Sequence, residues 1–153
     1  MKHQIGRLID HVHLRARDLE ATKRFYKAVL GALGISPAGD TPDHINFDEL
    51  WIDALGGDKG SSTHVHLAFQ AADREAVARF HAAGLAAGGR DNGKPGERDY
   101  HPGYYAAFLF DPDGNNVEAV FHGPAKRSAA SVVIEVPDPV ATAAANAGGT
   151  AKS

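Results

Sequence analysis

One segment of this sequence occurs twice, and its second copy follows the first at an offset of 55 residues. Of the 24 positions from 11 to 34, 11 carry the same residue 55 positions later. The shared residues include a histidine, an aspartate and a phenylalanine in each copy, namely His11, Asp18 and Phe25, then His66, Asp73 and Phe80. A repeat at a fixed offset indicates one supersecondary unit that occurs more than once. We therefore expect two copies of one small unit, each with a histidine at the same place.

The repeated segment predicts a strand followed by a helix. Residues alternate in character from Leu8 to Arg15, so that His11 and His13 share one face of a strand. Asp18 is a suitable N-cap, and apolar residues at spacings of three and four over 19–33 predict an amphipathic helix. We expect glycines to end this helix and its copy: Gly31 and Gly34 in the first, and Gly84, Gly88 and Gly89 in the second.

Further strands follow each helix. The expected strands are 44–47 and 50–54 in the first unit, and 103–110 and 116–122 after a second-copy strand over 63–71. The polar segment 90–102 is expected to be a long loop, and 111–115 a hairpin turn rather than a calcium loop. Each unit is thus a strand, a helix and two or three strands, which predicts the α+β class. We place the first module at 1–58, the second at 59–124 within the same domain, and a C-terminal strand and tail at 125–153, with the strand over 131–136.

Composition excludes several classes of function. The net charge is −3 and no basic stripe is present, which argues against a nucleic-acid partner. No apolar run is long enough to span a membrane, and no signal peptide is visible. The chain has nine histidines and no cysteine, so any metal site must use histidine and carboxylate ligands. We expect a cytoplasmic protein.

Three side chains are the candidate metal ligands: His11, His66 and Glu118. Two imidazoles and one carboxylate can bind a divalent ion on one side and leave positions open for substrate and water. The alternative is that each histidine is a half-buried polar residue on a sheet. Matching the tetrapeptide HVHL directly would pair His11 with His64, but it would break the helix register. His13 and His64 are possible substitute ligands or general bases.

Other candidate site residues have two interpretations each. Asp53 is expected to be the counterpart of Glu118, because Ile52-Asp53-Ala54 is similar to Val117-Glu118-Ala119. It could be a fourth ligand or a base, or else a solvated carboxylate at a strand end. A second set could line a pocket for an anionic or aromatic substrate, or serve only in strand packing: Arg98, Tyr100, His101, Tyr104 and Tyr105.

Three motifs give a resemblance to a known family. They are DHVHLRARDLEATKRFYKAVLGALG, HLAFQAADREAVARFHAAG and PGYYAAFLFDPDGNNVEAVFHGP, which together span most of residues 7–124. The chain resembles the vicinal oxygen chelate superfamily, which includes glyoxalases, bleomycin-resistance proteins and extradiol dioxygenases. The resemblance implies two tandem βαβββ modules that form a cupped mixed sheet with the helices outside. It also implies that His11, His66 and Glu118 bind one divalent ion (Fe, Mn, Ni, Co or Zn).

The resemblance further implies a homodimer. In several members of the family the cup is shared between chains, and in that arrangement His11 of one chain would join His66 and Glu118 of the other. We expect a metal-dependent glyoxalase-like lyase or isomerase whose small oxygenated substrate chelates the ion. The catalytic base would be His13, Asp53 or a loop residue. Strict glyoxalase I identity would need a glutamate ligand in the first module, where this chain offers only Asp53. The alternatives are an extradiol-type dioxygenase, a metal-free protein that sequesters an aromatic drug, and a regulatory protein with vestigial ligands.

Overall fold

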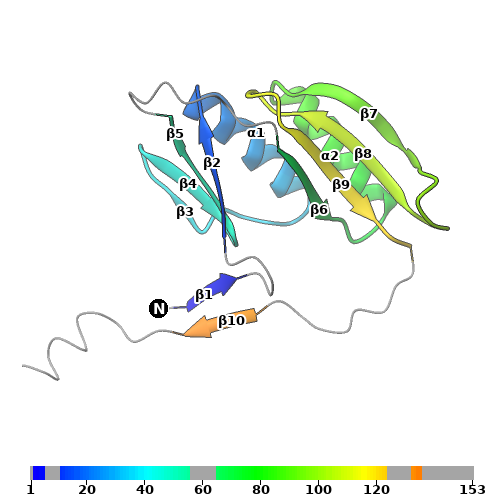
Figure 1. Cartoon of the computed structure of the whole chain (residues 1–153), viewed down its shortest axis with the longest axis horizontal. Helices are drawn as coiled ribbons and strands as arrows, with labels where there is room; N and C mark the ends of the chain where they lie inside the picture. Colours follow the sequence, from blue (N-terminus) through cyan, green and yellow to red (C-terminus); the bar gives the residue numbers. More distant parts are fainter. Residues whose placement is uncertain (1, 6–10, 56–64, 124–131, 136–153) are drawn as a thin grey trace, which may run out of the picture.

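The computed structural model describes residues 2–5, 11–55, 65–123 and 132–135 of the 153-residue chain. Within these ranges the chain forms two four-stranded mixed sheets, each with one helix on one face (Figure 1). The two units have the same order of elements, a strand, a helix and three strands. The predicted α+β class and the tandem βαβββ modules are therefore confirmed. Within one chain the strands of the two modules belong to separate sheets.

The first module begins with a short strand and a helix. Its elements are β2 (Val12–Ala16), α1 (Leu19–Ala32), β3 (Gly39–Asp40), β4 (His44–Phe47) and β5 (Leu50–Ala54). The sheet order is β2-β5-β4-β3, with β2 parallel to β5 and the other pairs antiparallel. The strands β2 and β5 can be parallel because α1, β3 and β4 lie between them in the sequence, and α1 returns the chain to the end of the sheet where β2 began. The strands expected over 44–47 and 50–54 are both present.

The second module repeats this arrangement. Its elements are β6 (His66–Gln70), α2 (Arg74–Ala86), β7 (Arg90–Glu97), β8 (Tyr105–Phe110) and β9 (Asn116–Phe121), in the sheet order β6-β9-β8-β7. The loop prediction for 90–102 was wrong over most of its length, because β7 is a strand. It pairs only with β8, and its register shifts on both sides of Gly93. Proline and glycine are tolerated on an edge strand at such irregularities.

A third, two-stranded sheet joins β1 (Lys2–Ile5) to β10 (Val132–Glu135) in antiparallel register. The strand expected within 131–136 is therefore present. Residues 56–64, which include His64, and the tail after residue 135 lie outside the described residues.

Aspartates begin both helices, as predicted. The carboxylate of Asp18 accepts from the backbone N–H of Ala21 at 3.0 Å, and that of Asp73 accepts from Ala76 at 2.6 Å. The glycines divide into two groups. Gly34 and Gly88 follow their helices at φ +82° and +95°, which is the conformation expected after a helix end.

Gly31 and Gly84 lie inside their helices, so the prediction that they end them was wrong. A Cβ added at Gly84 would lie 2.2 Å from Leu109 Cδ1 and 2.8 Å from Val29 Cγ1. Gly84 therefore permits the close approach of α2 to both α1 and β8.

A single core joins the two modules. The helices α1 and α2 pack against each other, and α2 lies behind β8 and β9 in the view of Figure 1. The largest fully buried side chains come from both helices and both sheets, including Phe25, Tyr26, Phe47, Phe80 and Leu109. Alternate residues of β2, β5 and β8 are buried in this core, so each sheet has one face in the core and one face directed away from it. We call these outer surfaces the first and second open faces.

The hairpin turn between β8 and β9 also fastens the modules together. Buried Asp111 accepts from the Tyr26 hydroxyl of α1 at 2.9 Å and from both the backbone and side-chain amide of Asn115 at 2.8 Å. Asp113 accepts from the backbone N–H of Arg17 at 3.1 Å and from the Thr22 hydroxyl at 3.3 Å. The predicted turn is present, and its carboxylates hold the start of α1.

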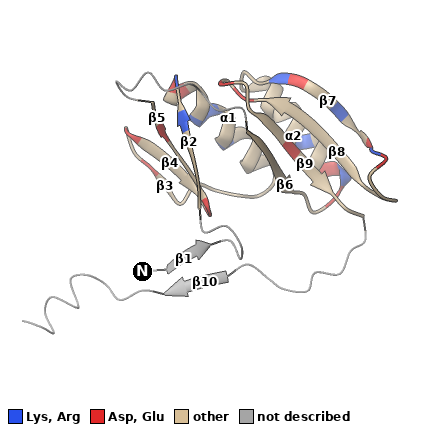
Figure 2. Ribbon diagram, in the orientation of Figure 1, with Lys and Arg blue, Asp and Glu red and all other residues tan. Residues whose placement is uncertain are grey.

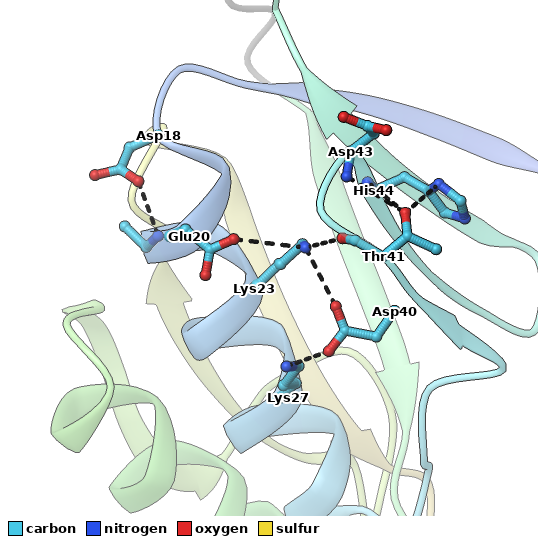
Figure 3. Close-up of polar contacts among 9 residues, drawn as sticks. Asp18, Glu20, Lys23, Lys27, Asp40, Thr41, Asp43 and His44 are labelled. Atoms are coloured by element: carbon cyan, nitrogen blue, oxygen red, sulfur yellow. Dashed lines mark hydrogen bonds and ion pairs between the residues drawn. The ribbon is translucent and has the colours of Figure 1, made fainter.

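A buried lysine attaches α1 to the strand segment that follows it (Figure 3). The ammonium of Lys23 lies 3.2 Å from the carboxylate of Asp40 and donates to the backbone carbonyl of Thr41. Lys27 pairs with the other oxygen of Asp40. These two lysines hold the pKa of Asp40 below its usual value, Lys27 having the larger effect. The segment 39–44 is thereby fixed to the helix.

Charged residues are mixed over the molecule. Figure 2 shows basic and acidic positions interspersed in both modules, for example along β7. No helix in the described part of the chain is both long and apolar enough to cross a bilayer.

Candidate functional site

The second open face carries a buried carboxylate held by two side chains. Glu118 of β9 is 2% exposed although it points away from the helices. Its Oε2 lies 2.8 Å from Nε2 of His66, and its Oε1 accepts from the Tyr104 hydroxyl at 2.6 Å. Two of the three predicted metal ligands are thus in direct contact. Each carboxylate oxygen has one partner, so the position of the carboxylate is fixed on both sides.

Strand pairing explains how these residues meet. β6 and β9 are parallel, with Ala68 opposite Glu118 and His66 opposite Asn116. On the other side of β9, Phe108 of β8 lies opposite Glu118. The Phe108 and His66 rings meet edge to face, with centroids 6.2 Å apart. An apolar ring therefore lies beside the imidazole, on the strand next to the one that carries the carboxylate.

Tyr104 is a hydrogen-bond donor over the whole physiological range. Burial raises the pKa of Tyr104 to about 12, and its hydrogen bond to Glu118 acts in the same direction. The hydroxyl therefore keeps its proton and donates it in a hydrogen bond to the Glu118 carboxylate, which acts as the acceptor.

A cluster of rings extends the second open face beyond Tyr104. Nε2 of His101 lies 2.9 Å from Nδ1 of His122, and their rings are stacked. The Tyr104 ring meets His101, His122 and Tyr100 edge to face. His122 was not among the predicted site residues. Its place at the end of the strand that carries Glu118 was the available signal.

The predicted substrate-binding residues do not all lie together. Arg98 places its guanidinium 5.4 Å above the Phe108 ring, on the side of the sheet that carries Glu118. Tyr105 instead packs against the core, and Arg74 of α2 lies 4.8 Å above its ring. Side chains alternate along a strand, so Tyr104 and Tyr105 point to opposite faces.

The first open face carries the other candidates. Nε2 of His13 lies 3.1 Å from Oδ1 of Asp53, and Nε of Arg15 lies 3.5 Å from the same oxygen. His11 is exposed just before β2. The predicted base candidates His13 and Asp53 are therefore neighbours, in the module that does not hold Glu118.

Strand register overturns the equivalence of Asp53 and Glu118. Ala68 is the repeat counterpart of His13, and it lies opposite Glu118, whereas His13 lies opposite Trp51. Trp51 therefore occupies in the first sheet the position that Glu118 occupies in the second. Asp53 lies two residues further along, opposite Arg15. Trp51 was missed because sequence similarity after the helices is too weak to fix the register.

A depression of about 340 Å³ opens beside Trp51. Its lining comes from the start of β2, from β4 and from the turn into β5: His11, His13, Asn46, Asp48, Glu49, Leu50 and Trp51. Asp48 has φ +39° and, with Glu49, forms the two-residue turn between β4 and β5 that contributes to this lining.

The described part of one chain supplies an incomplete donor set for a metal ion. Among the described residues, no group of three histidine, aspartate or glutamate side chains lies close enough to hold an ion. His66 and Glu118 supply two donors, and His11 lies on the other module.

Comparison with known proteins fits this geometry. The model of the Glyoxalase/Bleomycin resistance protein/Dioxygenase superfamily matches residues 8–119. The chain belongs to this superfamily. The resemblance stated from the three motifs is therefore confirmed. A glyoxalase/bleomycin resistance protein from Albidiferax ferrireducens T118 is 36% identical, with a TM-score of 0.62, over 72% of this chain and 94% of that one.

Two less similar solved structures share the fold. Lactoylglutathione lyase from Agrobacterium tumefaciens is 22% identical with a TM-score of 0.53, over 72% of this chain and 90% of that one. TioX from Micromonospora sp. ML1 is 18% identical with a TM-score of 0.54, over 72% of this chain and 95% of that one. No curated protein matches the chain significantly. The superfamily assignment thus fixes the fold and leaves the reaction open.

Proposed function

We propose that this protein is a divalent-metal-dependent, glyoxalase-like enzyme of the lyase or isomerase type, acting on a small oxygenated substrate. The observation that carries the proposal is the contact of His66 with Glu118. A carboxylate that is 2% exposed is costly to bury unless it has a strong partner. A cation bound by Glu118 and His66 would be such a partner. Tyr104 would then hold the free carboxylate oxygen, as it does now.

The third ligand in this proposal is His11 of a second copy. Within one chain, His11 precedes a strand of the first sheet and the His66–Glu118 pair belongs to the second, and these are separate sheets. A twofold dimer can place the first open face of one copy against the second open face of the other, and it does so twice. Each of two cups would then contain one His11 and one pair of His66 and Glu118.

A divalent ion in this cup would polarise the substrate oxygens and stabilise negative charge that develops on them. The residues of the chain supply the rest. Tyr104 holds Glu118 in place, while His13 accepts a proton and Asp53, 3.1 Å away, orients its ring. We also infer a cytoplasmic location from the absence of cysteine.

Two half-defective variants test the shared site. Neither His11→Ala nor His66→Ala alone should bind a stoichiometric transition metal. A mixed dimer of the two variants has one of its two cups intact. In a randomly reassorted mixture half of the dimers are mixed, so the mixture should hold about a quarter of the wild-type metal. Metal content is measured on protein purified without chelator, with size-exclusion chromatography and light scattering to report the dimer. Absence of metal in the mixture would contradict the shared site.

A second candidate is a metal-free binding protein that sequesters an aromatic molecule. It is favoured by Trp51, which holds the position equivalent to Glu118. This candidate predicts less than a tenth of an equivalent of metal in the wild type and no uptake on titration.

If the protein is instead an extradiol-type dioxygenase, it should bind Fe(II), and its activity should be lost when the iron is oxidised in air.

A further inference from the structure

The segment between β7 and β8 carries the tyrosine that holds Glu118. Residues 98–104 connect these strands at the end of the second sheet where β9 finishes, as Figure 1 shows. The backbone N–H of Arg98 donates to the carbonyl of Tyr104 at 3.0 Å, and the N–H of Tyr104 donates to the carbonyl of His101 at 3.1 Å. These bonds close the main chain into a turn, but they leave the rotation of the Tyr104 side chain undetermined. Other contacts must therefore fix its hydroxyl on Glu118.

Two glycines bring this segment against the end of β9. Gly103 has φ +85°, and Gly123, two residues after the strand, has φ +75°. A Cβ added at Gly123 would lie 3.4 Å from the carbonyl oxygen of Gly103 and 3.5 Å from its Cα. The two backbones are therefore in van der Waals contact, and the residues beside these glycines can reach each other across it.

Two imidazoles are hydrogen-bonded across this contact. Nε2 of His101 lies 2.9 Å from Nδ1 of His122. Nδ1 of His101 lies 3.0 Å from the carbonyl oxygen of Pro102, which can only accept, so this nitrogen carries a hydrogen. In a neutral imidazole the other nitrogen then carries none. Nε2 of His101 is therefore the acceptor, and Nδ1 of His122 is the donor.

The ring of Tyr104 packs on both members of this histidine pair. Its centroid lies 5.3 Å from that of His101 and 5.1 Å from that of His122, with planes 76° and 89° apart. Both contacts are edge to face, an arrangement that aromatic rings prefer. At the far end of the same ring, the hydroxyl donates to Oε1 of Glu118 at 2.6 Å. The direction of the phenol therefore depends on where the two imidazoles lie.

We propose that His101 and His122 are positioning residues, whose mutual hydrogen bond holds Tyr104 against Glu118. The pair acts through Tyr104, which contacts both imidazoles and the carboxylate. The inference rests on the proposed function only for its consequence, which is that a fixed carboxylate binds the divalent ion more tightly. Loss of the pair should then weaken metal binding by up to the loss of about tenfold expected for Tyr104→Phe.

Exchange of the Tyr104 hydroxyl hydrogen with solvent measures the positioning without any metal. It is followed by NMR on protein labelled at the ζ carbon of tyrosine, with Tyr104→Phe to assign the signal. His122→Phe keeps a ring and removes the donor, whereas His122→Asn keeps a donor near the place of Nδ1 and removes the ring. We expect exchange about tenfold or more faster in His122→Phe, and within about threefold of wild type in His122→Asn. The opposite order would show that only ring packing matters and would overturn the proposal.

His44→Phe is the matched control. His44 is a histidine of the first module whose Nδ1 lies 2.9 Å from the Thr41 hydroxyl, and its replacement should leave exchange at Tyr104 unchanged. An equal acceleration in this control would overturn the proposal. The tautomers are checked by a two-bond proton–nitrogen correlation spectrum at about pH 8, where imidazole is neutral. We expect the hydrogen of both imidazoles on Nδ1; a hydrogen on Nε2 of His122 instead would leave none between the rings and would also overturn it.

Metal titration separates this inference from the proposed function. Mn²⁺, Ni²⁺ and Zn²⁺ are titrated in turn. His122→Phe should bind them more weakly than wild type, and its combination with Tyr104→Phe should bind them no more weakly than Tyr104→Phe alone. Additive losses would overturn action through Tyr104.

Two outcomes divide the proposals. A wild type that takes up none of these ions, with exchange still faster in His122→Phe, would refute the enzyme and support the positioning role. Stoichiometric metal in the wild type, with equal exchange in wild type and His122→Phe, would do the reverse.

Discussion

The Tyr104 hydroxyl donates to Glu118 Oε1 across 2.6 Å, on the side of the carboxylate opposite His66. A hydrogen bond to a ligand oxygen orients the ligand, and its loss typically costs ten- to a hundredfold in metal affinity. We expect Tyr104→Phe to weaken binding of a divalent ion by about tenfold in calorimetric titration. Tyr100→Phe is the matched control, because its ring is 72% exposed and packs on Tyr104. Equal affinities in the two variants would contradict the orienting role.

The same hydroxyl predicts a loss of stability in alkali. The pKa of Tyr104 is raised to about 12, chiefly by burial, while an unfolded tyrosine titrates near 10. Between these values the unfolded chain releases a proton that the folded chain keeps, so the stabilisation is complete below pH 10 and declines as the pH rises toward 12. Tyr104→Phe lacks this contribution. In urea unfolding, the difference in unfolding free energy between wild type and Tyr104→Phe should shrink between about pH 8 and about pH 11.5. A difference that stays constant over this range would be evidence against the raised pKa of Tyr104.

The contact between Tyr26 and Asp111 predicts coupling between the modules. Both side chains are buried, and their hydrogen bond of 2.9 Å joins α1 to the β8–β9 turn. Tyr26→Phe leaves a buried carboxylate with one partner fewer, which should cost about 1–3 kcal/mol of unfolding free energy. In a double-mutant cycle with Asp111→Asn, we expect a coupling of about 1 kcal/mol or more. Additive effects would mean that this contact does not join the modules.

Two helical glycines should respond to alanine with opposite signs. At Gly31 nothing lies within 4 Å of an added Cβ, so Gly31→Ala should raise the unfolding free energy by about 0.5–1 kcal/mol through helix propensity. At Gly84 the added methyl meets Leu109 and Val29, so Gly84→Ala should lower it by about 1–3 kcal/mol through overpacking. Urea unfolding of both variants checks the pair. A stabilising Gly84→Ala would show that α1 and α2 can move apart at little cost.

These glycines also show which parts of the fold the sequence could predict. The repeat of His11, Asp18 and Phe25 at a fixed offset predicted two equal modules, because helix caps and apolar stripes depend on local spacing. It could not distinguish Gly84, which allows helices to approach, from Gly88, which ends one. That difference depends on what lies across the interface. For the same reason β7 was predicted as a loop, since an edge strand tolerates glycine and proline.

The candidate site was predictable only in part. His66 and Glu118 were predicted as ligands of one ion, and their side chains are in contact across the paired strands β6 and β9. The equivalence of Asp53 with Glu118 was wrong, because a register error of two residues preserves the face and so leaves the pattern of polar residues unchanged. The importance of Trp51 could not be inferred without that register. The meeting of His11 with the other two ligands depends on a second copy and remains a prediction.

Asp40 should make stability depend on pH in acid. Its two lysine partners lower its pKa below that of an unfolded aspartate, Lys27 first and Lys23 second. On acidification the unfolded chain therefore binds a proton first, so the contribution is present above about pH 4 and is lost as the pH falls through the folded-state value. Asp40→Asn should lose this contribution and also leave buried Lys23 without one of its carboxylate partners.

Urea unfolding over a range of pH tests Asp40. Asp40→Asn should have a lower free energy of unfolding than wild type at neutral pH, and this difference should become smaller below about pH 4. Lys27→Met, which removes the exposed partner, should reproduce the pH-dependent part, while Lys23→Met should add a pH-independent loss because it also removes the donor to the Thr41 carbonyl. A gap for Asp40→Asn that stays constant to low pH would show that the ion pairs do not stabilise the fold. The segment that holds His44, and with it Trp51, would then owe its position to backbone pairing alone.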